Sequence, residues 1–303
     1  MRVLVTGGTG FIGSNLALEL QAQGHDVYIT GSMHEQELPT FGNRIFYAGI
    51  AGIDWDALGP LDVVFHQGAI SDTRVPNRKE ILRANFETSK ILFETAVAHG
   101  AKHIVYASST AVYGTLPPPY RESGPVAPLT PYAESKALLD EYAMDFAVKH
   151  PDVRVVGLRY CNVYGPREYH KRKTATMIYQ FAQQMQKGNP KLFASGEQRR
   201  DYIYVKDVVS ANLLALHVSQ SVVVNCGTGV ATSFNDIVTN LNEVLGLNRT
   251  PDYIPNPYGE QYQSYTECDM TYAKEKLGFT PTFTITEGIR DYATSGFLTT
   301  PPL

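Results

Sequence analysis

The first thirty residues constrain the fold of this chain more than any other segment. Residues 2–6 (RVLVT) form a short run rich in β-branched side chains, and this run stops at glycines. A segment with helical apolar spacing then begins at Phe11 and stops at Gly24, and a second β-branched run, DVYIT, follows at residues 26–30. This succession predicts a strand, a tight loop, a helix and a second strand, which together form a βαβ unit.

The loop inside this unit reads TGGTGFIG, with Gly7, Gly10 and Gly13 spaced three apart. Glycine permits a tight turn and a close approach of the backbone, and the N-terminus of the following helix offers N–H groups to a pyrophosphate. A plain tight turn is the alternative, but the strand-loop-helix context favours a dinucleotide site. Within this loop the predicted cofactor-binding residues are Gly7, Gly10, Phe11, Ile12 and Gly13.

Strands and helices alternate through the first half of the chain. Further strands are predicted at residues 62–67, 103–109 and 153–160, and helical segments at residues 79–99 and 132–149. This alternation predicts an α/β fold with a Rossmann-like, doubly wound parallel sheet. Ligands of such sheets bind beyond the carboxyl ends of the strands.

The alternation breaks after Pro166. A helix is predicted near residues 177–185, another starts with Asp207 as its expected cap, and SVVVNCG is expected to return to the main sheet as a strand. We expect residues 1–166, with about 203–232, to form an NAD(P)-binding domain. Residues of about 167–202 and 233–303 would form a smaller, discontinuous C-terminal lobe that binds the substrate.

Composition excludes several classes of protein. The 303-residue chain has a formal net charge of −4, which argues against a general nucleic-acid binder. No apolar run approaches the ~18 residues of a membrane-spanning helix. The three cysteines, Cys161, Cys226 and Cys268, are far apart in sequence, so neither a disulfide framework nor a metal site is expected. These features indicate a cytoplasmic protein without nucleic-acid or membrane partners.

The second strand lacks an expected acid. A dinucleotide site usually places an acidic residue at the end of this strand to hold the adenosine ribose. Here Gly31 and Ser32 occupy that place, and we expect both to contact the cofactor. The missing acid removes repulsion toward a 2′-phosphate, yet no arginine is adjacent to grip one, so the choice between NAD and NADP stays open.

The spacing Tyr-x-x-x-Lys occurs four times, beginning at Tyr132, Tyr169, Tyr202 and Tyr272. Only Tyr132 opens a predicted helix directly after a long loop, and Pro131 suits a first helical turn. Residues four apart share a helix face, so Tyr132 and Lys136 point the same way. A surface Tyr–Lys pair is the alternative interpretation.

Ser109, at the end of a predicted strand, completes a catalytic set with Tyr132 and Lys136. At about 4 Å and an effective dielectric near 20, an ammonium favours a phenolate by roughly 4 kcal/mol. Tyr132 is therefore expected to take a hydroxyl proton while hydride leaves the same carbon, and Ser109 is expected to hydrogen-bond the oxygen.

Six motifs in order resemble the extended short-chain dehydrogenase/reductase family. They are TGGTGFIG, HQGA (66–69), Asn85 in RANFETSKILFE, SSTAVYG (108–114), PYAESK and RYCNVYGP (159–166). The resemblance implies that Gly68, Ala69 and Asn85 also contact the cofactor. The chain departs from the family at Gly31 and at Gly49, where aspartate is common.

The second half is most similar to the ADP-glycero-manno-heptose 6-epimerases, through NVYGPREYHKRKTATM, PKLFASGEQRRDYIYVKDV and YQSYTECDM. This similarity implies that Lys171 is a second acid/base, although HKRK by itself reads as a solvated basic loop. The implied substrate-contacting residues are Ser71, Asn162, Gln180, Phe193, Arg200 and Tyr262.

The resemblance implies a nucleotide-sugar epimerase that inverts a carbinol through transient oxidation by tightly bound NAD or NADP, one per subunit, in a homo-oligomer. ADP-glycero-manno-heptose inverted at C6″ is the preferred substrate, and UDP-hexose 4-epimerisation is the alternative. A nucleotide-sugar dehydratase or reductase and a non-catalytic dinucleotide-binding sensor are further alternatives. Dehydratases of this family carry Asp-Glu where this chain has Thr110–Ala111.

Overall fold

A seven-stranded parallel sheet forms the centre of the molecule. The computed structural model describes residues 1–32, 38–47, 49–72, 75–255 and 264–301. The sheet has the order β10-β6-β5-β4-β1-β2-β3, and each neighbouring pair is parallel. Its strands are β1 (Arg2–Thr6), β2 (Asp26–Thr30), β3 (Ile45–Phe46), β4 (Val63–His66), β5 (His103–Ser109), β6 (Arg154–Tyr160) and β10 (Val222–Cys226).

Helices cover both faces of this sheet, because alternate strand residues are apolar on both sides. Val3 and Val5 of β1 join the core that contains Leu16 of α1 (Phe11–Ala22) and Val208 of α7 (Val205–Leu214). Leu4 packs in a separate core under α4 (Thr88–Ala98). A third core lies between β5, β6 and α5 (Pro131–Lys149). Together with short α2 (Trp55–Leu58) and α3 (Arg78–Leu82), these helices confirm the predicted doubly wound Rossmann-like fold.

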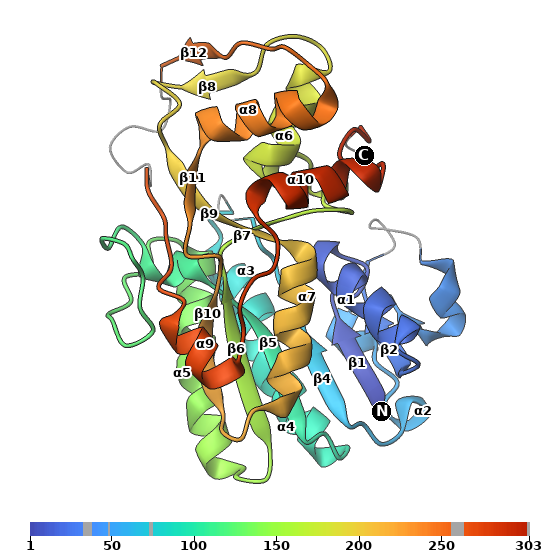
Figure 1. Cartoon of the computed structure of the whole chain (residues 1–303). Coiled ribbons are helices and arrows are strands. Elements are labelled where there is room, and N and C mark those ends of the chain that lie inside the picture. Colours follow the sequence, from blue (N-terminus) through green and yellow to red (C-terminus); the bar gives the residue numbers. More distant parts are fainter. Residues whose placement is uncertain (33–37, 48, 73–74, 256–263, 302–303) are drawn as a thin grey trace.

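A smaller lobe lies above the carboxyl end of the sheet (Figure 1). It holds a two-stranded parallel sheet of β8 (Lys191–Phe193) and β12 (Asp252–Ile254) and three helices, α6 (Met177–Met185), α8 (Phe234–Leu245) and α10 (Ile285–Thr294). A three-stranded sheet of β7 (Asn162–Tyr164), β9 (Arg199–Tyr204) and β11 (Ala231–Ser233) lies between this lobe and the main sheet. The remaining helix, α9 (Thr271–Leu277), lies beside β10.

The chain passes back into the main sheet after building part of the upper lobe. Strand β10 pairs with β6 in parallel, from Val222 opposite Val156 to Cys226 opposite Tyr160. The predicted return of SVVVNCG to the main sheet is therefore confirmed. The short strands β3, β7, β8, β11 and β12 gave no clear alternation in the sequence and were not predicted.

Asp207 is not a helix cap, contrary to our expectation. Helix α7 begins two residues earlier, after Tyr204, and Asp207 lies buried in its first turn. Its carboxylate accepts hydrogen bonds from the backbone N–H and hydroxyl of Thr282 (2.9 and 2.7 Å) and from the N–H of Phe283 (3.1 Å). It therefore anchors the segment before α10 instead of starting a helix.

Two of the cysteines that are far apart in sequence meet in space. The Sγ atoms of Cys161 and Cys268 are 2.8 Å apart, and the Asp201 carboxylate lies close enough for the three to form a small cluster. However, Asp201 already accepts hydrogen bonds from Thr228, Gly229 and Cys268. Its role is thus to tie β9 to two neighbouring segments. No described helix has both the length and the apolar character needed to cross a membrane.

Candidate active site

A cavity of about 940 Å³ lies at the carboxyl ends of the parallel strands, below the smaller lobe. Thr6, Thr30, Gln67, Ser109 and Tyr160 each end or directly follow a strand of the main sheet, and all five line it. The opposite wall comes from the segment 170–177 and from β9 and α8. This is the position that ligands occupy in doubly wound sheets.

Most of the residues predicted for the site line this one cavity. They are Gly7, Gly10, Phe11, Ile12, Gly13, Gly31, Ser32, Gly68, Ala69, Ser71, Ser109, Tyr132, Lys136, Asn162, Lys171 and Arg200. They come from segments spread over almost two hundred positions, and the fold brings them together.

The glycine loop fits a dinucleotide. Gly7 has φ of +63°, and a Cβ there would lie 2.7 Å from the Cα of Gly68. A Cβ on Gly13 would lie 2.1 Å from the carbonyl oxygen of Gly7. Gly10 is the N-cap of α1 without a side-chain cap, so the first N–H groups of the helix face the cavity uncovered. The loop is thus a cradle that side chains would fill, next to a helix N-terminus suited to a pyrophosphate.

At the other end of the cavity, Gly31 and Ser32 occupy the position where a carboxylate for the ribose was expected. A Cβ on Gly31 would lie 1.9 Å from the Oγ1 of Thr9, and that hydroxyl accepts a hydrogen bond of 3.1 Å from the N–H of Ser32. Gly49 also lines the cavity, with φ of +61°. The two departures seen in the sequence therefore face the same ligand space.

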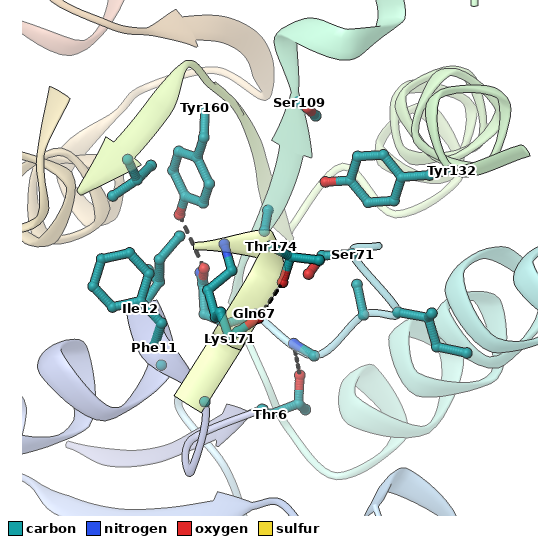
Figure 2. Close-up of a pocket in the computed structure, with 18 of the residues that line it drawn as sticks. Thr6, Phe11, Ile12, Gln67, Ser71, Ser109, Tyr132, Tyr160, Lys171 and Thr174 are labelled. Carbon is teal, nitrogen blue, oxygen red and sulfur yellow. Dashed lines mark hydrogen bonds between the residues drawn. The ribbon is translucent and has the colours of Figure 1, made fainter. Parts of the chain in front are cut away.

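Tyr132 is the second residue of α5, and its hydroxyl points into the pocket (Figure 2). The hydroxyl of Thr130 caps this helix by accepting the N–H of Ala133 at 3.2 Å. Burial raises the pKa of Tyr132, while a hydrogen bond from Ser109 opposes that rise. Burial is the larger of the two effects, so the pKa of Tyr132 lies above its ordinary value in the protein without a bound dinucleotide.

Lys136 is buried one helical turn further along α5. Its Nζ donates a hydrogen bond of 2.8 Å to the carbonyl of Ala107 and lies 5.8 Å from the ring centre of Tyr132. Burial lowers the pKa of Lys136 to about 8, and the charge of Asp140 opposes this shift. Asp140 is itself paired with buried Arg159 at 2.8 Å. The carbonyl of Ala107, inside β5, therefore holds the ammonium close to the tyrosine ring.

Lys171 reaches the pocket from a different element, a 3-10 turn spanning Tyr169–Thr174 (Figure 2). Its Nζ lies 5.8 Å from the ring centre of Phe11. Burial lowers the pKa of Lys171, and the charge of Glu168 opposes this shift. It is thus a half-buried amine beside the cofactor loop rather than part of a solvated basic loop, which was the alternative interpretation of HKRK.

The structure places three predicted contact residues outside the cavity wall. Asn85 is buried in a π turn (Arg83–Glu87) and holds both backbone groups of Ile70, at 2.8 and 3.0 Å. Gln180 of α6 donates at 2.7 Å to the carbonyl of Ala175, which lies in the segment before this helix. Phe193 ends β8 and does not line the cavity. Tyr262 lies outside the described residues.

Asn85 and Gln180 instead brace segments that do line the cavity. The side chain of Asn85 also donates to Ser135 at 3.2 Å, and Ser135 donates to the carbonyl of Tyr132 at 2.7 Å. Asn85 thus connects the loop after β4 with the start of α5. The sequence motif singled out Asn85 as a residue of the cofactor site. The structure shows that its side chain holds the loop and the helix start that border this site.

A hydrogen-bond network that we did not predict forms the floor of the pocket. The hydroxyl of Tyr160 donates to Gln67 at 3.1 Å (Figure 2), Gln67 donates to Asn212 at 3.0 Å, and Asn212 donates back to Tyr160 at 2.8 Å. Gln67 belongs to the HQGA motif, which was a usable signal. Asn212 comes from α7, and only the fold brings it here.

His66 fixes the loop that follows β4. Its Nε2 donates to Ser89 at 2.7 Å, because the Ser89 hydroxyl already donates to the carbonyl of Asn85. Its Nδ1 therefore accepts from Thr6 at 2.6 Å, and Thr6 accepts the N–H of Gly68 at 3.1 Å. Burial lowers the pKa of His66 to about 3, so the ring is neutral and in one tautomer.

Comparisons with known proteins identify the family of this chain. Residues 3–227 match the model of the NAD dependent epimerase/dehydratase family. The chain is 36% identical over 313 aligned residues to an ADP-L-glycero-D-manno-heptose-6-epimerase of Alkalilimnicola ehrlichii, and the match covers 96% of each protein.

Two solved structures are similar over nearly the whole chain. One is an ADP-L-glycero-D-manno-heptose-6-epimerase of Helicobacter pylori, with a TM-score of 0.84 at 34% identity, covering 97% of this chain and 95% of that one. The other is a UDP-glucose 4-epimerase of Thermotoga maritima, with a TM-score of 0.87 at 30% identity, covering 98% and 99%. This chain belongs to the NAD dependent epimerase/dehydratase family.

Proposed function

We propose that this protein is a nucleotide-sugar epimerase whose substrate is ADP-glycero-manno-heptose, inverted at C6″. The observation that carries the proposal is that Ser109, Tyr132, Lys136 and Lys171 line the same cavity as the glycine loop. A plain dinucleotide-binding protein has no need of two separate acid/base groups at the far end of its cofactor site. The relatives at 36% and 34% identity support the choice of sugar.

Tyr132 is the proton acceptor for the hydroxyl of one epimer. Ser109 lowers the pKa of Tyr132, and its hydroxyl is proposed to hydrogen-bond the anionic form of Tyr132. Lys136, with a pKa of about 8, is still charged at neutral pH and adds an attractive field from beneath the ring. A bound nicotinamide dinucleotide supplies the hydride acceptor and donor, together with a positive ring in its oxidised form.

Lys171 serves the other epimer. Inversion turns the carbinol hydroxyl to a new direction, so a second group must exchange its proton. Lys171 suits this role because burial lowers its pKa and favours the neutral amine that accepts a proton, while the charge of Glu168 favours the ammonium that donates one. One residue can then act as a base in one direction and as an acid in the other.

Arg200 is the proposed clamp for the substrate diphosphate. Its guanidinium carbon lies 6.0 Å from the ring centre of Phe234, and both residues line the cavity. Arginine binds phosphate oxygens in a bidentate manner. Asn162 and Ser71 line the same cavity and are proposed to contact the substrate.

The proposed cofactor is a tightly bound NAD or NADP, one per subunit. Gly31 and Ser32 provide no carboxylate for a 2′-hydroxyl, and no lysine or arginine occurs among residues 31–43 to bind a 2′-phosphate. These residues do not decide between NAD and NADP. Denaturing the purified protein and analysing the released dinucleotide by mass spectrometry identifies which one is bound.

UDP-hexose 4-epimerisation is the second candidate. It is favoured by the higher TM-score, 0.87, of the Thermotoga maritima enzyme. Incubating the protein with ADP-heptose, UDP-glucose and related nucleotide sugars, and following each by NMR without added cofactor, separates the two. Conversion of a UDP-hexose but not of ADP-heptose would refute our choice of substrate, and absence of any conversion would favour a sensor.

We also propose a homo-oligomer in the cytoplasm. Ile91 of α4 and Val148 of α5 are 65% and 82% exposed, and we propose that these apolar side chains contact another subunit. The three free thiols suit a reducing compartment. Light scattering of the purified protein and fractionation of the source cells test these two points.

A further inference from the structure

Glu168 is a buried carboxylate at the base of the segment that carries Lys171. It is fully buried, and both of its oxygens are occupied. Oε2 accepts the N–H of Thr176 at 2.9 Å, and Oε1 accepts the hydroxyl of Thr176 at 3.0 Å and the N–H of Gly165 at 3.4 Å. Glu168 thus joins Gly165, which follows β7, to Thr176, which directly precedes α6.

The segment between these two anchors has an unusual backbone. Arg167, four residues before Lys171, has φ of 75°, and Arg172, directly after it, has φ of 51°. Residues other than glycine rarely adopt such positive φ angles. The Lys171 N–H donates to the carbonyl of Glu168 at 2.9 Å, and the hydroxyl of Thr174 donates to the carbonyl of Lys171 at 2.7 Å (Figure 2). Conformations of this kind persist only where the surroundings hold them, and Glu168 supplies the bonds at both ends.

Among the described residues, few titratable groups face this pair. The groups that face Glu168 are the phenols of Tyr164 on β7, Tyr179 on α6 and Tyr292 on α10, together with the amine of Lys171. Burial raises the pKa of Glu168 to about 7, while the bonds from Thr176 and the charge of Lys171 oppose the rise. In turn, Glu168 is the group that keeps the pKa of Lys171 from falling further.

We propose that Glu168 is the positioning residue of the second acid/base, holding the Lys171 turn over the pocket and supplying the counter-charge for its ammonium. This inference rests on the proposed function, because Lys171 matters to the reaction only if the protein inverts a carbinol. Glu168 does not line the cavity, so it acts through Lys171 and not on the substrate.

The test compares Glu168→Gln with Glu122→Gln in the full chain carrying its co-purified dinucleotide. Glu122 is a suitable control because this partly buried carboxylate likewise accepts a backbone N–H, from Asn225 at 2.7 Å, and does not line the cavity. Reductive methylation with ¹³C-formaldehyde followed by NMR gives the titration of each lysine. Lys171→Arg identifies the Lys171 resonance by its loss.

We expect the pKa of Lys171 to be lower in Glu168→Gln than in the wild type and unchanged in Glu122→Gln. We also expect kcat to fall by about 10- to 100-fold with little change in KM, as for a displaced catalytic group. In a Lys171→Ala background, Glu168→Gln should cause no further loss. An unchanged Lys171 titration in folded Glu168→Gln, or a normal kcat, would overturn the proposal.

Thr176→Val provides a second test that keeps the carboxylate. It removes only the hydroxyl donor at 3.0 Å, so less of Glu168 is ionised at neutral pH and the Lys171 titration should move in the same direction by a smaller amount. An unmoved titration there would also count against the proposal. If the wild type converts no nucleotide sugar, the proposed function fails, and the titrations still report whether the Glu168–Lys171 pair exists.

Discussion

Replacing Ser109 with alanine tests the chemistry at Tyr132 most directly. Ser109 is the group that lowers the pKa of Tyr132 against the effect of burial. A hydrogen bond to a charged partner contributes about 1.5–3 kcal/mol. At about 1.4 kcal/mol per factor of ten, its loss should reduce kcat by roughly 10- to 150-fold.

The pH dependence gives the expected change a direction. Tyr132 must be ionised to accept a proton, and Ser109→Ala raises its pKa, so the rising limb of kcat with pH should move to higher pH. The assay is NMR of the converted nucleotide sugar over a pH series, with circular dichroism as a check on folding.

Ser108→Ala is the matched control. Ser108 is the adjacent residue of the same strand, and within the described part of the chain its buried hydroxyl has no hydrogen-bond partner. Ser108 lines the same cavity, but Ser109 is the serine that acts on the pKa of Tyr132, so Ser108→Ala should retain kcat within about twofold. If Ser109→Ala is as active as Ser108→Ala, or if its pH limb does not move, the assignment of Ser109 is wrong.

Three further substitutions separate the remaining roles. Tyr132→Phe should lower kcat by at least about 100-fold with an unchanged circular dichroism spectrum, since a positioned acid/base contributes that much; a smaller loss would exclude Tyr132 as the base. Lys171→Ala should slow epimerisation far more than Lys173→Ala, because the side chain of Lys173 is exposed to solvent. Equal rates would show that Lys171 has no catalytic role. Lys136→Met should abolish activity yet stabilise the protein at pH 7. The pKa of Lys136 is lowered from 10.5 to about 8 by burial. This shift lowers the free energy of unfolding of the wild type by about 3 kcal/mol at pH 7. Lys136→Met removes that cost but loses about 1 kcal/mol with the bond to Ala107. Because the unfolded chain binds the extra proton between pH 8 and 10.5, the wild type gains stability with rising pH in that window. The advantage of Lys136→Met in urea unfolding should therefore shrink toward pH 10.5, and a constant advantage would contradict this account.

Local patterns predicted the parts of the structure that depend on neighbouring residues. The run from β1 through Gly7 and Gly13 to α1 was readable because strand, loop and helix signals follow one another without interruption. The Tyr132–Lys136 pair was readable because Pro131 marks the helix start. Lys171, by contrast, came only from a family resemblance, since its own segment has no helical or strand periodicity.

Two residues expected to contact ligands lie outside the cavity wall for a shared physical reason. Asn85 and Gln180 both turn their amides onto backbone carbonyls of adjacent segments, and this choice depends on the path of loops that no local pattern encodes. The contact between Cys161 and Cys268 joins residues 107 positions apart. The pKa of Tyr132 depends on how deeply α5 buries it, and spacing in the sequence says nothing about depth.

Strand β10 comes late in the sequence but pairs with β6 in the central sheet, so the chain cannot be cut into two fragments that each contain a complete sheet. A fragment that stopped after the glycine loop, the catalytic helix and β6 would lack the strand that pairs with residues 156–160. In such a fragment β6 would be an exposed edge strand with unpaired N–H and C=O groups. Edge strands of this kind pair with strands of other chains, so the fragment should aggregate. The two halves of this molecule are therefore not interchangeable modules, and a new sugar specificity has to be built by substitutions within one continuous framework.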